Sequence, residues 1–401
     1  MSVDRGMLAL PFYDERHREL AERIVQWCDK NADLWTDTTD PTGTADTAAP
    51  ADPERVVRST LRALGEDGWF DWDGDHRSLC LAREALAYAD DLADFAYSIQ
   101  SLAATPLARH GDEEQRRRFL PHLASGALIG AFALSEEGAG SDVAAIGLAA
   151  EPDEGGYLLN GRKAWIANGT IADLYCVIAR TGDGPGPLGL TAFLVPASTP
   201  GISVEPVRLI APRPFANLEF TDCRVPAENV LGGRGKGFAI AMDLLDRVRM
   251  TVGAAALGFA RRAVDAAYLR ARERAIYGGT LLDVPGVRAA FADAEVKLNA
   301  AALLVARAAW ETDRGTRRAP KDSAIAKLYA TERAQEIVDA CVQLHGAAGL
   351  VGGSLPERLY RQIRSLRVYE GPSEVQAAIV ADALDVRARV RGAGRVRGAG
   401  R

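Results

Sequence analysis

Residues 155–169, GGYLLNGRKAWIANG, mark the point where a helical sequence pattern gives way to a β pattern. The dipeptides Asn160-Gly161 and Asn168-Gly169 are strong tight-turn signals, because Asn and Gly adopt positive φ at little cost. Four short runs rich in β-branched and aromatic residues follow, separated by Gly, Pro and Asp. They cover residues 173–180, 190–197, 202–207 and 216–225. The pattern predicts a compact antiparallel β domain, a barrel or sandwich, over residues 131–232.

On both sides of this domain, apolar residues recur at the three- and four-residue spacing of amphipathic helices. The helical runs before it cover residues 14–28, 52–68, 77–104 and 112–126. Those after it are longer and rich in alanine, which favours a bundle with close helix–helix contacts; they cover residues 238–275, 286–313 and 321–349. We therefore predict an α+β protein with a helical N-terminal domain (1–130), the middle β domain, and a C-terminal domain like a four-helix bundle (233–386).

Composition excludes several classes of function. The whole chain carries −6, yet the tail 387–401 holds six Arg and no acid, so residues 1–386 carry −12. An acidic body argues against nucleic-acid binding, and the repetitive tail has nothing to bury and is predicted to be disordered. No window approaches the roughly 18 apolar residues of a membrane span, and no secretory signal is visible. Five scattered Cys indicate reduced thiols in the cytoplasm, and five His without metal-ligand spacing predict no metal site.

Several motifs are weak when taken singly. In AFALSEEGAGSD (131–142), Ser135, Ser141 and small residues allow backbone to approach a planar or anionic ligand, although a capped turn would look the same. Trp165 could stack on a ring system or simply fill a core. VLGGRGKGF (230–238) is not a phosphate-binding loop, because no Ser or Thr follows the Lys. Arg274 could be a solvated charge at a helix end.

The segment LRVYEGPSEVQ (366–376) places a carboxylate, Glu370, directly before the helix-breaking pair Gly371-Pro372. The chain resembles the acyl-CoA dehydrogenase family from about residue 15 to 385, with matching blocks of sequence in the same order. The matching blocks are 111–142, 159–173, 220–249, 271–279, 324–349 and 356–376. The resemblance implies FAD held between the β domain and the C-terminal helices, a homotetramer or homodimer, and an electron-transfer flavoprotein as electron acceptor.

The resemblance also assigns roles to individual positions. Glu370 matches the catalytic base; an alternative base on an earlier helix is excluded, because Val248 stands at that position. Four residues match substrate-side positions: Ser141, Asp246, Arg249 and Gly371. Nine match contacts to FAD: Phe132, Leu134, Ser135, Ser141, Trp165, Ala167, Arg274, Gln343 and Gly346. Arg274 matches a residue that reaches the FAD pyrophosphate of a neighbouring subunit.

The implied reaction is the α,β-dehydrogenation of an acyl thioester to the trans-2-enoyl thioester. The α-hydrogen is weakly acidic, so its removal as a proton needs a positioned base and a stabilised enolate oxygen. An apolar setting of Leu366, Val368 and Tyr369 would make the Glu370 carboxylate a stronger base. The Gly-Pro break frees backbone amides for the thioester carbonyl. The β-hydrogen leaves as hydride to the flavin.

Some positions depart from the family pattern. Ala167 stands where a hydroxyl usually contacts the flavin, and departures also occur at Pro285, Ala347, Pro372 and Glu374. They keep two alternatives open: a flavin-dependent oxidase or monooxygenase-like relative, and a non-catalytic homologue that binds acyl thioesters. Nothing in the sequence decides whether the thioester is carried by coenzyme A or by an acyl-carrier protein.

Overall fold

The computed structural model of the chain describes residues 3–35, 52–72, 74–182, 184, 186–316 and 319–384. The chain divides into two compact units. The helical unit comprises the described parts of Met1–Arg23, Asp75–Tyr88 and Asp246–Arg401, and the sheet unit comprises those of Ile24–Gly74 and Ala89–Leu245. The domain boundaries predicted from the sequence stay predictions. The tail 387–401 lies outside the described residues.

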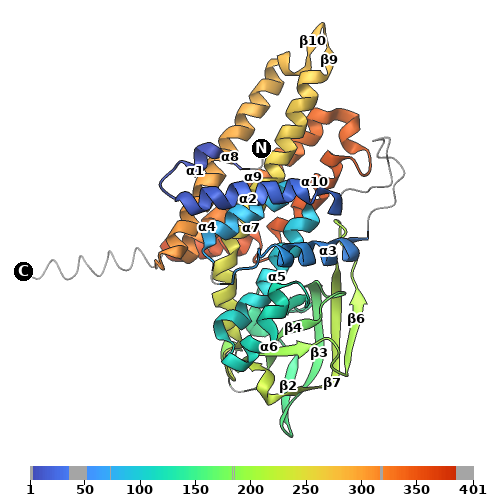
Figure 1. Cartoon of the computed structure of the whole chain (residues 1–401), viewed down its shortest axis with the longest axis vertical. Coiled ribbons are helices and arrows are strands. Elements are labelled where there is room, and N and C mark those ends of the chain that lie inside the picture. Colours follow the sequence, from blue (N-terminus) through green and yellow to red (C-terminus); the bar gives the residue numbers. More distant parts are fainter. Residues whose placement is uncertain are drawn as a thin grey trace, which may run out of the picture. The chain divides into compact units, whose positions relative to one another are not determined.

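Three long helices make up most of the helical unit (Figure 1): α7 (Gly237–Glu273, from Asp246 onward), α8 (Pro285–Asp313) and α9 (Ala319–His345). Alanine dominates their shared core, and on α7 Ala254, Ala255, Ala256 and Ala260 are fully buried. A Cβ atom at Gly258 of α7 would lie 2.3 Å from the Glu84 carbonyl oxygen of α4 (His76–Ala89). Small residues therefore let these helix backbones touch.

Shorter elements complete the helical unit. They are α1 (Arg5–Leu8), the first part of α2 (Glu15–Lys30), β9 (Ala275–Ile276), β10 (Gly279–Thr280), η5 (Leu281–Asp283), η6 (Gly346–Leu350), α10 (Leu355–Ile363) and η7 (Arg364–Arg367). Residues 373–384 are also helical.

The sheet unit combines helices with an eight-stranded sheet. Its helices are the end of α2, η1 (Ala32–Leu34), α3 (Pro53–Glu66), α5 (Asp91–His110), α6 (Glu113–Ala124), η2 (Val143–Ala145), η3 (Gly186–Gly189) and η4 (Ala227–Asn229). Its strands are β1 (Gly130–Ala133), β2 (Ala149–Asp153), β3 (Gly156–Ala167), β4 (Leu174–Arg180), β5 (Leu190–Pro196), β6 (Ile202–Pro206), β7 (Phe215–Pro226) and β8 (Val230–Leu231).

The strands follow the order β6-β7-β3-β2-β4-β5-β8, and β1 adds to β4. Most pairs are antiparallel, but β1 runs parallel to β4, and β2 meets β4 in parallel at Ala149. The sheet is therefore mixed. Large apolar side chains such as Tyr175, Phe193 and Phe220 fill its core. The predicted fold class, with helical segments on both sides of a β segment in the chain, is confirmed, but the sheet is mixed and not wholly antiparallel as predicted.

Two local predictions are wrong. Asn160-Gly161 forms no turn: it lies inside β3, where Gly161 has φ 136° and the register with β7 shifts. Pairing with β7 on both sides of the dipeptide outweighs its turn preference. The helical run 77–104 is broken at Asp90, whose extended backbone ends α4 and whose carboxylate accepts from the Leu92 N–H (2.8 Å) to start α5.

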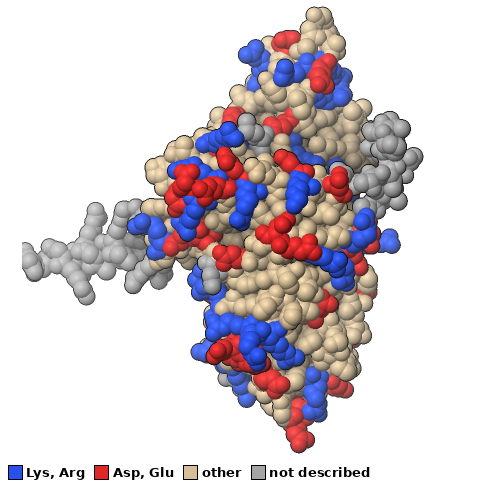
Figure 2. Space-filling view, in the orientation of Figure 1, with Lys and Arg blue, Asp and Glu red and all other residues tan. Residues whose placement is uncertain are grey.

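No helix in the described ranges is long and apolar enough to cross a membrane. Acidic and basic side chains lie interspersed on the face of the molecule drawn in Figure 2. All five cysteines are buried, and none of them forms a disulfide bond in the described part of the chain.

Candidate active site

The predicted base lies in a strained segment, residues 367–376, which we call the Glu370 segment. It follows η7, and both Glu370 (φ 53°) and Gly371 (φ 89°) adopt the left-handed backbone conformation. A non-glycine residue in this region costs about 1–2 kcal/mol. Strain of this kind persists only where surrounding contacts hold it, and it is concentrated at functional sites.

Two side chains of the helical unit hold the Glu370 segment. The fully buried Gln376 amide donates from Nε2 to the carbonyl oxygens of Glu370 (3.2 Å) and Gly371 (2.9 Å). Glu332 of α9 accepts from Arg367 Nε (2.8 Å) and from the Ser373 hydroxyl (2.5 Å). The segment is therefore fixed before, at and after Glu370.

The apolar setting expected around Glu370 forms only in part. Leu366 is fully buried and Tyr369 packs against the core of the helical unit. Val368, however, is 55% exposed, so its predicted role in that setting is wrong for the single chain. The segment turns at Val368 (φ −105°, ψ −53°), at the end of η7, and this local geometry sends the side chain outward.

Two predicted substrate-side residues, Asp246 and Arg249, meet on α7. One oxygen of the Asp246 carboxylate accepts from Arg249 Nη1, and the Asp246 side chain is 41% exposed. Arg249 is 6% exposed, and its Nε has no hydrogen-bond partner in the described part of the chain. A buried cation with a spare donor is suited to an anionic or carbonyl group of a ligand.

Arg274 and Gly346, both predicted to contact FAD, also come together in the helical unit. Arg274 is exposed at the end of α7, and a Cβ atom at Gly346 would lie 3.5 Å from its Nη1. Gly346 has φ 63° and follows α9, near whose end Gln343 is exposed.

The sheet unit holds the remaining predicted contacts to FAD. Phe132 of β1 and Leu134 are buried, whereas Ser135 is half-buried and Ser141 is exposed. The Ala164 N–H donates to the Ser135 carbonyl oxygen (2.9 Å), which brings the Ser135 loop beside β3. Further along β3, Trp165 is 49% exposed at φ 56°, and its N–H donates to Asn217 Oδ1 (3.1 Å). Ala167 ends the strand without a hydroxyl.

An ion pair that sequence reasoning missed supports this loop. The buried Lys163 Nζ donates to the Leu134 carbonyl oxygen (2.9 Å) and to Glu136 Oε1 (2.8 Å). Burial lowers the pKa of Lys163 to about 8, against the opposing attraction of Glu136. Glu136 also accepts from the Gly147 N–H (2.8 Å), and the pair lines a groove of about 250 Å³. In the sequence, Lys163 is a charged residue that follows another, Arg162, and nothing in this pattern indicates that the Lys163 side chain is buried.

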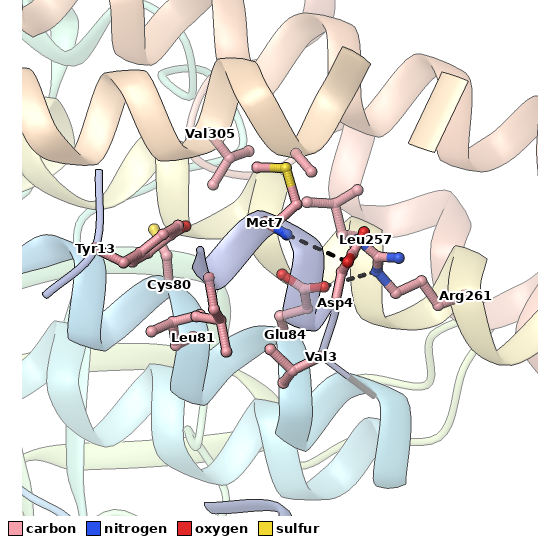
Figure 3. A pocket seen from close by; sticks show the side chains of 12 residues that line it. Val3, Asp4, Met7, Tyr13, Cys80, Leu81, Glu84, Leu257, Arg261 and Val305 are labelled. Atoms are coloured by element: carbon pink, nitrogen blue, oxygen red, sulfur yellow. Dashed lines mark hydrogen bonds and ion pairs between the residues drawn. The ribbon is translucent and has the colours of Figure 1, made fainter. Parts of the chain in front are cut away.

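A cavity in the helical unit is too small to serve as the substrate site. It lies among α1, α4, α7 and α8 (Figure 3), and its volume is about 10 Å³. That is room for a single water. Its polar lining is closed by the Arg261–Glu84 ion pair (2.8 Å), so it is part of the packing and not a thioester pocket.

Each of the two units presents residues that fit part of a flavin dinucleotide. The sheet unit offers a half-exposed Trp165 and the hydroxyls of Ser135 and Ser141, which make no hydrogen bond within the described part of the chain. The helical unit offers the exposed Arg274 cation next to a glycine. Exposed aromatic faces and cations are the groups that bind ring systems and pyrophosphates. Ala167, by contrast, offers no hydroxyl where the family pattern has one.

The order of helical, β and helical segments, with a carboxylate on a strained loop near the end, is that of the flavin-dependent acyl-thioester dehydrogenases. Three family models match: acyl-CoA dehydrogenase N-terminal domain (residues 14–127), middle domain (131–223) and C-terminal domain (235–384). This chain belongs to the acyl-CoA dehydrogenase family.

Individual relatives agree. The chain is 35% identical over 351 residues to the mitochondrial short-chain specific acyl-CoA dehydrogenase of Rattus norvegicus, covering 84% of this chain and 85% of the relative. The structure of butyryl-CoA dehydrogenase from Megasphaera elsdenii matches with a TM-score of 0.83 and 31% identity, over 92% and 98% of the two chains. A prolyl acyl carrier protein oxidase, AnaB, matches with a TM-score of 0.82 and 25% identity, over 93% and 99%.

Proposed function

We propose that this protein oxidises an acyl thioester to its trans-2-enoyl thioester, with Glu370 as the base that removes the α-proton. One observation carries the assignment: Glu370 is held in a left-handed conformation by contacts before, at and after it. A positioned general base contributes about 10²–10⁴-fold to a rate, and only when its geometry is fixed.

The neighbouring groups have complementary tasks. The Gly371 N–H donates to no group in the described part of the chain, so it can stabilise charge on the thioester oxygen when the α-proton leaves. Arg249 and Asp246 would bind the thioester arm, together with Ser141. The Glu370 carboxylate takes the proton, and the electron pair of the broken C–H bond forms the new double bond.

When bound, FAD would supply the acceptor for the hydride that leaves the β-carbon. The residues proposed to hold it are Phe132, Leu134, Ser135, Ser141, Trp165 and Ala167 in the sheet unit, and Arg274, Gln343 and Gly346 in the helical unit. The family resemblance supports two further parts of the proposal: an electron-transfer flavoprotein as acceptor and a homotetramer or homodimer as the assembly. A cytoplasmic location stays a proposal from the cysteine pattern.

The test is an anaerobic titration of the purified, flavin-loaded protein with acyl-CoAs of increasing chain length. We expect one length range to bleach the visible flavin absorption. Glu370→Gln should bind the same thioester but reduce the flavin about 10²–10⁴-fold more slowly. Asp382→Asn, a change at an exposed carboxylate in the last described helix, is the matched control. Protein that contains no flavin would refute the proposal in favour of a non-catalytic homologue.

A second candidate is an oxidase that acts on a carrier-bound acyl group. It is favoured by the absence of a hydroxyl at Ala167 and by the similarity to the prolyl acyl carrier protein oxidase. Flavin that no acyl-CoA bleaches, but that a carrier-protein thioester bleaches and oxygen rapidly restores, would identify this activity. Slow reoxidation by oxygen together with fast reoxidation by an electron-transfer flavoprotein would exclude it.

A further inference from the structure

A lysine that the proposed chemistry does not use lies directly beneath the Glu370 segment. Lys327 lies in the first half of α9, its side chain is fully buried, and its Nζ donates to the Gly371 carbonyl oxygen at 2.7 Å. Burial of an ammonium group costs several kcal/mol unless partners compensate it. A neutral side chain of the same size would avoid this cost, so the buried charge calls for a local reason.

Four charged groups face Lys327. The carboxylates of Glu370 and Glu332 attract its ammonium group, while Arg249 of α7 and Arg367 repel it. Burial is the largest influence and lowers the pKa of Lys327 to about 8. Lys327 is therefore charged at neutral pH and loses its charge under mildly alkaline conditions.

Lys327 binds the carbonyl group of Gly371, the residue that follows Glu370. Gln376 also donates to the Gly371 carbonyl (2.9 Å), so this oxygen accepts two hydrogen bonds. Of the two donors, only Lys327 is charged, and charge-assisted hydrogen bonds are roughly twice as strong as neutral ones. The Gly371 carbonyl belongs to the peptide that follows Gly371, and Gln376 holds the carbonyl of the preceding peptide, that of Glu370 (3.2 Å). With both carbonyls fixed, rotation of the backbone at Gly371, directly after Glu370, is limited.

We propose that Lys327 is a positioning residue for Glu370, since its ammonium group holds the Gly371 carbonyl and faces the catalytic carboxylate. The inference rests on the proposed function only for its kinetic consequences. The hydrogen bond from Lys327 to the Gly371 carbonyl, which we call the tether, lies within the helical unit.

Removal of the tether should slow proton abstraction without changing flavin content. Lys327→Met removes both donor and charge, whereas Lys327→Gln keeps a shorter, neutral donor. We expect the limiting rate of flavin reduction to fall about 10- to 100-fold in the Met variant, as expected for a displaced catalytic group, and less in the Gln variant. Lys321→Met, on the same helix and only partly buried, is the control.

The pH profile separates positioning from a merely structural role. In the wild type the rate of flavin reduction should fall as pH rises through about 8, because Lys327 loses its charge there. Both Lys327 variants should lack this limb, and Lys321→Met should keep it. A Lys327→Met protein with the wild-type rate and the wild-type profile would overturn the proposal. If the Met variant fails to fold, the Gln variant decides by the same profile.

A stability measurement tests Lys327 independently of catalysis. The unfolded chain keeps Lys327 protonated to a pKa of about 10.4, so above pH 8 the folded protein binds fewer protons at this site. The free energy of unfolding of the wild type should therefore rise relative to Lys327→Met between these pH values. If no thioester bleaches the wild-type flavin, the proposed function fails, while this difference still decides whether Lys327 is buried with a lowered pKa in the folded protein.

Discussion

Gly371 combines two constraints at the residue scale. Its φ of 89° disfavours any side chain, and a Cβ atom there would lie 2.5 Å from Gln376 Nε2. Gln376 is fully buried and donates to two carbonyl groups, so it cannot move aside without losing them. Glycine is therefore needed here for both backbone and space.

Gly371→Ala should destabilise the protein by about 1–2 kcal/mol through backbone strain alone. We also expect slower flavin reduction by acyl thioester, because the displaced Gln376 no longer fixes the Glu370 carbonyl. Thermal unfolding and single-turnover reduction measure the two effects. Gly352→Ala is the control, since a Cβ atom at Gly352 meets open space. Equal behaviour of the two variants would contradict the steric argument.

The sequence could predict Glu370 but not the residues that hold it. A carboxylate before Gly-Pro is visible as a local pattern. Lys327 and Glu332, by contrast, lie on an ordinary helical run some forty residues earlier, and their importance arises only when α9 packs under the Glu370 segment. Helical periodicity ranks a lysine among exposed positions, whereas Lys327 is fully buried.

At the scale of elements, Gln100 joins α5 to the start of the sheet. Its Nε2 donates to the carbonyl oxygens of Leu123 and Leu128 (2.8 Å each), and its Oε1 accepts from the Gly130 N–H (2.9 Å). Gln100 is fully buried. One side chain thus fixes the end of α6 and the first residue of β1, the strand that carries Phe132.

Gln100→Leu keeps the volume but leaves the Leu128 carbonyl and the Gly130 N–H without this partner, whereas the Leu123 carbonyl still accepts from the Gly126 N–H (3.2 Å). Each buried unsatisfied group costs about 1–3 kcal/mol, so we expect a loss of at least about 2 kcal/mol. Urea unfolding measures it, and weaker retention of FAD would report a displaced β1. Ser101→Ala on the same helix is the control, because the Ser101 hydroxyl donates to the Tyr97 carbonyl oxygen within α5 (2.8 Å). A loss below 1 kcal/mol would refute the bridging role.

Elements were predictable where a local pattern matches the final environment. The runs 173–180, 190–197 and 202–207 became β4, β5 and β6. The failure at Asn160-Gly161 has a different cause: β7 pairs with β3 on both sides of the dipeptide, and a glycine with φ 136° accommodates the register shift without a turn. Strand partners distant in sequence decide such positions, and a local window does not contain them.

At the scale of the whole molecule, two kinds of buried ionisable group have opposite effects on the free energy of unfolding at alkaline pH. Burial raises the pKa of all five thiols, for example to about 11 at Cys223 and about 12 at Cys28. Burial lowers the pKa of Lys163 and Lys327 to about 8. Both kinds exist because the chain buries groups that prefer water when charged.

The signs of the two effects differ. An unfolded thiol releases its proton near pH 8.5 while the folded one keeps it, so stability falls as pH rises above that value, by up to about 1.4 kcal/mol per pH unit and thiol. Each lysine instead raises the stability as pH rises between about pH 8 and 10.4, because the unfolded state then binds more protons.

The five buried thiols outnumber the two buried lysines. We therefore expect the free energy of unfolding, measured with urea under reducing conditions, to fall steeply from about pH 8.5 upward. Cys176→Ala should make the decline shallower by one proton, and a free energy that stays level up to pH 10 would show that the thiols are not buried as the structure has them.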